Sequence, residues 1–152
     1  MIKSLIYKLV LPLTIISFAA IVKWWYALPI DGPETLLYGF PFPFISEAWH
    51  TSMSIQIFLL ELGVNFITFL SFWFLLVFSI HQFVIKIRTY KIVTIVLWVL
   101  SGFILLAATL IASSSNNLWY IKRPFNIEVM ETGYKCIWQN TDRPNYPTYH
   151  PK

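Results

Sequence analysis

Three long apolar runs constrain this chain more than any other feature of its sequence. They cover residues 9–22, 55–85 and 92–112, and the second has Glu61 as its one acidic residue and no Lys or Arg. A helix needs about 20 apolar residues to cross the hydrocarbon of a bilayer. The runs therefore predict an integral membrane protein with several crossings.

The charges of the chain agree with this interpretation. Hydrophobic residues make up 57% of the sequence and charged residues 12%, whereas soluble domains carry about a quarter charged residues. The net charge of +4 does not indicate nucleic-acid binding, because the basic residues flank the apolar runs. These flanking residues are Lys3, Lys8, Lys86, Arg88 and Lys91.

The distribution of Lys and Arg predicts the orientation. The five residues just named would lie on one side of the membrane, against Lys23, Lys122 and Arg123 on the other. Because cytoplasmic loops carry the excess of positive charge, the N-terminus is predicted to be cytoplasmic and the C-terminus extracytoplasmic. The first run is interpreted as a retained signal anchor rather than a cleaved signal peptide, since Lys23-Trp24-Trp25 follows it directly.

The predicted fold class is therefore an all-α membrane protein. Residues 1–112 form a domain with helices at about 5–25, 55–85 and 92–112, and residues 26–54 form an ordered outer loop. Residues 113–152 form an extracytoplasmic tail able to make a short β-hairpin. In that hairpin, residues 126–130 and 134–138 are the strands, and Glu131-Thr132-Gly133 is the loop.

An aromatic and proline-rich segment stands out in the outer loop. It consists of Phe40, Pro41, Phe42, Pro43 and Phe44. Proline fixes φ and disfavours helix in the residue before it, so the segment is predicted to be extended, with three Phe side chains on one side. Two interpretations remain open: a lid on the outer helix ends or in the headgroup zone, and a docking strip for another membrane subunit.

The same residues carry a resemblance. Gly39-Phe40-Pro41-Phe42-Pro43-Phe44 resembles the Gly-Phe-Pro-(Leu/Phe)-Pro-(Phe/Tyr/Trp) segment of small uncharacterised bacterial inner-membrane proteins. The likeness covers about residues 20 to 80. It implies a bacterial integral membrane protein and supplies no activity.

Polar residues form a stripe along the second run. At 100° per residue, five of them fall within about 60° of one another: Ser54, Glu61, Asn65, Thr68 and Ser79. Lipid offers such a stripe no partner, so it is predicted to face protein or water. Three roles remain open for Glu61: hydrogen bonding that fixes helix packing, the passage of ions or protons, and an exposed side chain at the interface. Lys23 is a candidate counter-charge for Glu61.

The third run carries small residues on one face, where they let helix backbones approach closely. They are Thr94, Ser101, Ala108 and Ala112. This face is predicted to pack on the other helices or on a partner.

Residues suited to catalysis or metal binding are few. Cys136 is the sole cysteine, and His50, His81 and His150 lie in different segments. No Cys/His cluster has metal-ligand spacing, and no nucleotide-binding loop or nucleophile motif is present. The sequence therefore predicts no enzyme, no haem, no metal and no other cofactor.

These observations lead to a predicted function. We expect a non-catalytic small subunit or scaffold of a larger complex in the bacterial inner membrane, docking through the third helix, the outer loop and the tail. The alternative is a homo-oligomeric ion or proton channel lined by the Glu61 stripe. The predicted partners are the lipid bilayer and other membrane subunits, not nucleic acid.

Overall fold

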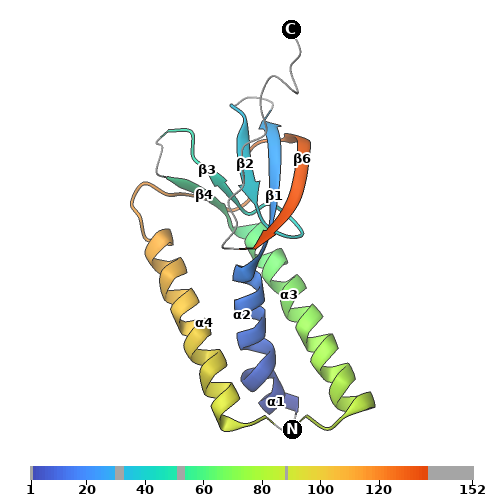
Figure 1. Ribbon diagram of the computed structural model, residues 1–152. Coiled ribbons are helices and arrows are strands. Elements are labelled where there is room, and N and C mark those ends of the chain that lie inside the picture. The colour runs from blue at the N-terminus through green and yellow to red at the C-terminus, as the bar shows by residue number, and fades with distance from the viewer. Residues whose placement is uncertain (1, 30–32, 51–53, 88, 137–152) are drawn as a thin grey trace. The chain divides into compact units, whose positions relative to one another are not determined.

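The chain is divided between two compact units that alternate along the sequence. The computed structural model describes residues 2–29, 33–50, 54–87 and 89–136. Met1–Ala20 and Phe66–Ser113 form the first, here called the helical unit, and Ile21–Asn65 and Ser114–Lys152 form the second, the sheet unit. Figure 1 shows the elements of each in chain order.

The predicted all-α fold class is wrong. Helices take 52% of the described residues and strands 26%, and the strands form one six-stranded mixed sheet. The expected first helix ends at Ala20 rather than near residue 25, and the expected second helix starts at Leu59 rather than Ile55. A short apolar run does not by itself distinguish a buried strand from a helix, and the reassigned stretches are rich in β-branched and aromatic residues that favour strands.

Six helical segments belong to the described chain, and α3 begins within the sheet unit. Their bounds are α1 Ile2–Leu5, η1 Ile6–Val10, α2 Leu11–Ala20, α3 Leu59–Ser79, η2 Ile80–Val84 and α4 Lys91–Ala112, where η marks a π-helix. The stretches Lys3–Ala20, Leu59–Val84 and Lys91–Ala112 are each long and apolar enough to cross a membrane. These bounds differ from the predicted helices chiefly at residues 21–25 and 55–58, which belong to strands.

Helix α2 contacts both α3 and α4 within the helical unit (Figure 1). The Phe18 ring meets Phe69 edge to face at 5.6 Å, and the Trp73 indole N–H donates to Ser17 Oγ at 2.7 Å. These contacts join α2 to α3 through one aromatic cluster and one polar contact.

The contacts between α2 and α4 follow from a proline. The N–H of Leu11 bonds to the carbonyl of Ile6, so η1 has π-helical hydrogen bonding just before Pro12. In this register the Tyr7 carbonyl would need the N–H of residue 12, which proline lacks. The Trp98 indole supplies the missing donor, at 2.9 Å from the Tyr7 oxygen. The Ser101 hydroxyl shares its one proton between the Leu97 carbonyl at 2.8 Å and the Pro12 carbonyl at 3.2 Å.

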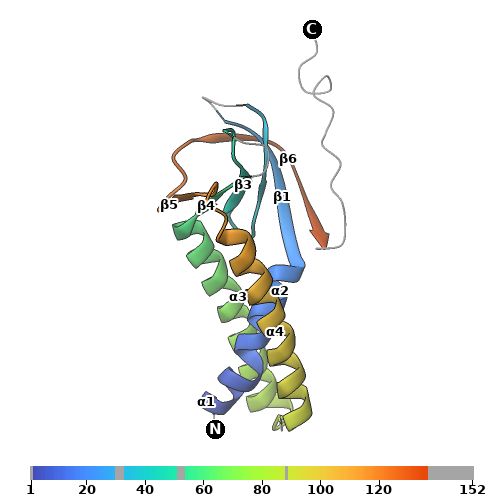
Figure 2. The same ribbon diagram turned by 90° about the vertical axis from the view of Figure 1, so that its left-hand side faces the viewer.

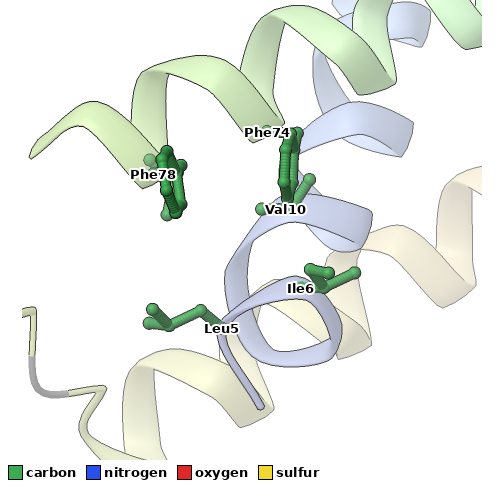
Figure 3. Close-up of a pocket in the computed structure, with 6 residues that line it drawn as sticks. Leu5, Ile6, Val10, Phe74 and Phe78 are labelled. Carbon is green, nitrogen blue, oxygen red and sulfur yellow. The ribbon is translucent and has the colours of Figure 1, made fainter. Parts of the chain in front are cut away.

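Most of the helical surface is apolar and exposed. Of the 22 residues of α4, Ser101 alone is buried. A hollow between the N-terminal helical segments and α3 is likewise lined by apolar side chains, with Phe74 and Phe78 opposite Val10 (Figure 3). Such surface is compatible with lipid as its solvent.

The sheet takes its strands from both segments of the sheet unit. Their bounds are β1 Ile21–Pro29, β2 Thr35–Tyr38, β3 Ile45–Glu47, β4 Ile55–Phe58, β5 Leu118–Tyr120 and β6 Ile127–Cys136. The order is β5-β4-β3-β2-β1-β6, which puts β5 and β6 at opposite edges (Figure 2). Strands β4 and β5 run parallel, and the other neighbours are antiparallel.

One face of the sheet carries the core of this unit. Ala27, Leu37 and Phe58 are fully buried, and Phe125, from the segment that connects β5 to β6, packs on them. The Phe125 ring lies 5.8 Å from that of Phe58 and 5.0 Å from that of Trp49. The connection therefore closes the core over the sheet.

The predicted hairpin of the tail is wrong. Residues 127–136 form the single strand β6, which pairs with β1 along its whole length, from Ile21 opposite Cys136 to Pro29 opposite Ile127. Gly133 lies opposite Trp24 rather than in a turn, and a Cβ there would lie 2.6 Å from the Trp24 ring. Pairing with β1 along the whole of β6 is therefore more favourable than the turn predicted at Glu131-Thr132-Gly133. Trp138, the predicted end of the hairpin, lies outside the described residues.

Candidate functional site

The candidate site is organised by a turn at residues 39–44, here called the aromatic turn. Gly39 has φ of +144°, and a Cβ there would lie 2.6 Å from Phe44 Cδ1, so a glycine is required. Phe44 N–H donates to the Tyr38 carbonyl at 2.9 Å, which closes the turn between β2 and β3. The predicted extended ribbon is thus replaced by a bent segment.

Asn65 on α3 holds the centre of the aromatic turn. Its side chain is fully buried. Phe42 N–H donates to Asn65 Oδ1 at 3.0 Å, and Asn65 Nδ2 donates to the Phe42 carbonyl at 2.5 Å. The amide therefore pairs with the Phe42 backbone as a neighbouring strand would. It brings one residue of the predicted polar stripe, Asn65, into contact with one residue of the predicted docking strip, Phe42.

The opposite side of the turn is held by strand β1. Gly39 N–H donates to the Lys23 carbonyl, and the Trp25 indole donates to the Gly39 carbonyl, both at 2.9 Å. Trp25 lies at the end of the predicted first helix, at about 5–25, but the structure places it on β1, where its indole bonds to the turn. Lys23 Nζ lies 3.6 Å from the centroid of the Trp25 ring, a cation–π contact.

The three phenylalanines of the turn point to different surroundings. Phe42 is 52% exposed. The Phe40 ring lies 6.0 Å from that of Tyr134 on β6, and Phe44 is half-buried. The expectation of three rings on one side of a ribbon is therefore wrong, because the bend separates them. Phe42 is the exposed tip.

Glu61 lies beside Arg123 rather than Lys23. Glu61 Oε1 accepts a long hydrogen bond from the Arg123 backbone N–H at 3.4 Å. Burial lowers the pKa of the Arg123 guanidinium, and the negative charge of Glu61 opposes that shift. The predicted pairing of Lys23 with Glu61 is replaced by this one, which the sequence did not indicate because Arg123 lies 62 residues from Glu61.

The remaining stripe residues do not form one continuous row. Ser54 precedes β4 and is not on the helix, Thr68 is half-buried and Ser79 is exposed. Glu61 Oε2 is buried without a hydrogen-bond partner among the described residues. Glu61 and Asn65 thus belong to the sheet unit, whereas Thr68 and Ser79 belong to the helical unit.

The small-residue face of α4 is used over part of its length. Ser101 is fully buried and bonded to Pro12, and Thr94 and Ala112 are half-buried. Ala108 is exposed, although seven residues place it within about 20° of Ser101 around the helix. The face that packs on α2 at Ser101 is therefore open at Ala108.

The described part of the chain holds no group of three or more metal-ligating side chains. The two histidines in it contact backbone groups: His81 Nδ1 accepts the Ile87 N–H at 3.0 Å, and His50 Nε2 lies 3.2 Å from the Asn116 carbonyl oxygen. His150 lies outside the described residues.

Comparison with known proteins identifies no matching family model, no matching curated protein and no matching solved structure.

Proposed function

We propose that this chain is a non-catalytic subunit or scaffold of a protein complex in the bacterial inner membrane. Three helices cross the bilayer, and the sheet unit lies on the extracytoplasmic side. The proposal has two supports, the topology of the chain and the open face of α4.

Chain connectivity supports the topology. Strand β1 follows α2, β4 precedes α3, and β5 follows α4. If each helix crosses once, these three helix ends lie on one side of the membrane. The pairing of β1 with β6 and of β4 with β5 agrees with this arrangement, and the excess of Lys and Arg at the other helix ends favours the cytoplasm for that side.

The observation that carries the scaffold function is the open face of α4 at Ala108. In lipid, helices associate through close backbone approach at small residues. The same face already packs on α2 at Ser101, so its geometry suits helix packing. We therefore propose that a transmembrane helix of another subunit covers Ala108.

Photo-crosslinking in intact cells tests this function. A photoreactive side chain at Ala108 should form one discrete adduct with another membrane protein. The same side chain at Val99, which is also exposed and lies on the opposite side of α4, should form none. Equal adducts from both positions, or a lone monomer in mild detergent, would contradict the scaffold function.

A second function, an ion or proton channel, is favoured by one observation. Glu61 Oε2 is buried without a partner among the described residues, and a buried carboxylate in a membrane helix is a candidate for ion handling. Reconstituted protein should then conduct ions, and Glu61→Gln should lower the conductance. Absence of flux, or flux unchanged in Glu61→Gln, would exclude the channel.

A further inference from the structure

We propose that the sheet unit contacts the lipid directly, through two apolar tips that insert into the outer leaflet. The tips are Phe42 of the aromatic turn and Ile121, which follows β5. This inference rests on the membrane insertion proposed above. It assigns the lipid interface, not another protein, as the ligand of these two side chains.

Both tips are exposed, and both are hydrogen-bonded to the first turns of α3. Phe42 is 52% exposed and Ile121 80% exposed. Phe42 is bound at both backbone groups by Asn65, and the Ile121 carbonyl accepts the Leu60 N–H at 2.9 Å. The position of each tip along the membrane normal is therefore tied to a known residue of α3.

The length of α3 places those residues at the edge of the hydrocarbon. Its apolar stretch Leu59–Val84 has 26 residues and extends about 39 Å at 1.5 Å per residue. The hydrocarbon is about 30 Å thick, so about three residues project at each end of a centred helix. Leu60 then lies at the headgroup level, and Asn65 lies just inside the hydrocarbon.

The two α3 residues that bond to the tips lie on different sides of the helix. Five residues separate Leu60 from Asn65, which corresponds to a rotation of about 140° and a rise of about 7.5 Å. Exposed Leu59 and Leu60 continue the apolar surface at the upper level. Lipid would therefore meet apolar side chains over more than one side of the first turns of α3.

Three backbone N–H groups of the aromatic turn have the partners that this depth requires. Irregular backbone in hydrocarbon is costly unless its polar groups are satisfied. Pro41 and Pro43 have no N–H to satisfy. The N–H groups of Gly39, Phe42 and Phe44 all have partners, and so does the Phe42 carbonyl.

One basic residue, Lys122, follows the second tip. Lys122 is exposed and directly follows Ile121, and a lysine can extend its ammonium group to the headgroup phosphates while its methylene groups stay in apolar surroundings. This pattern of an apolar residue followed by a cation suits the boundary between acyl chains and headgroups.

Spin-label accessibility tests the proposal in the full chain reconstituted into lipid nanodiscs. Nitroxide labels are attached in a Cys136→Ser background at Phe42→Cys and Ile121→Cys. Collision with oxygen, which concentrates in lipid, is compared with collision with a water-soluble nickel chelate. Both labels should collide several-fold more with oxygen, as the interface position requires.

Two exposed reference positions calibrate the result. A label at Val129→Cys on β6 should favour the nickel chelate, and a label at Phe103→Cys on α4 should favour oxygen most strongly. Nickel-favoured collisions at Phe42 and Ile121, equal to those at Val129, would overturn the proposal. So would low accessibility to both reagents, which would show that protein covers the tips. If the Phe103 label favoured nickel, the membrane insertion itself would be wrong.

Asn65 variants separate a specific tether from general destabilisation. Asn65→Asp keeps the size of the side chain but cannot donate to the Phe42 carbonyl. It should reduce the oxygen preference at Phe42 and leave that at Ile121 unchanged. An unchanged oxygen preference at Phe42 in this variant would contradict the role of Asn65 in setting its depth, and a loss at both positions would contradict two independent tethers.

Discussion

The helical unit and the sheet unit treat apolar side chains in opposite ways. Helix α4 exposes almost all of its apolar residues, and the residue it buries is Ser101. The sheet unit buries Ala27, Leu37 and Phe58 completely and closes them with Phe125. The helical unit buries few apolar side chains, among them Val10 and Phe69, and leaves most of its apolar surface exposed. The sheet unit is organised around an apolar core of its own.

The largest difference between the units is expected from two Phe→Ala substitutions. Phe58→Ala empties a fully buried position and should cost about 3–5 kcal/mol. Phe103→Ala changes a side chain that is 67% exposed on α4 and should cost less than about 1 kcal/mol, since no internal cavity forms. Denaturation of both variants in mild detergent measures the difference, and equal costs would contradict the contrast between the buried Phe58 and the exposed Phe103.

Glycine substitutions should separate the aromatic turn from the helices. Gly39→Ala introduces a Cβ against Phe44 at a positive φ and should cost about 2–3 kcal/mol. Gly102→Ala on α4 meets no atom within 4 Å and should cost nothing, because alanine favours helix. The denaturation midpoints of the two variants provide the measurement. A stable Gly39→Ala protein would show that the turn tolerates a side chain.

The Asn65 amide should account for a smaller part of the stability of the sheet unit. Asn65→Leu leaves both backbone groups of Phe42 without their partner and should cost about 1–3 kcal/mol. Protection of the Phe42 amide in hydrogen exchange should fall, whereas protection of the core residue Phe58 should change less. Unaltered protection at Phe42 would show that another group satisfies its backbone.

The contacts between α2 and α4 should have the smallest effects. Ser101→Ala removes the donor to the Pro12 carbonyl, and Trp98→Phe removes the donor to the Tyr7 carbonyl. Each should cost about 0.6 kcal/mol, the average for hydrogen bonds between membrane helices. A double variant measures whether the two add. If either variant lost more stability than Asn65→Leu, the prediction that the contacts between α2 and α4 contribute least would be wrong.

Part of the candidate site could be predicted because polar residues in an apolar run are conspicuous. Asn65, Glu61 and Ser101 were all singled out from the sequence. Their partners were not, since Phe42, Arg123 and Pro12 lie 23, 62 and 89 residues away. Composition reveals that a group needs a partner, but it does not identify which distant backbone group will meet it.

Local composition by itself determined that three stretches of this chain are apolar enough to cross a bilayer, and that basic residues cluster at one set of their ends. Only the tertiary structure decided where those helices stop. Ile21–Pro29 and Ile55–Phe58 are strands because they pair with segments far along the chain. The physical reason is that hydrophobicity is a property of each segment, whereas a strand exists through the hydrogen bonds of its neighbours.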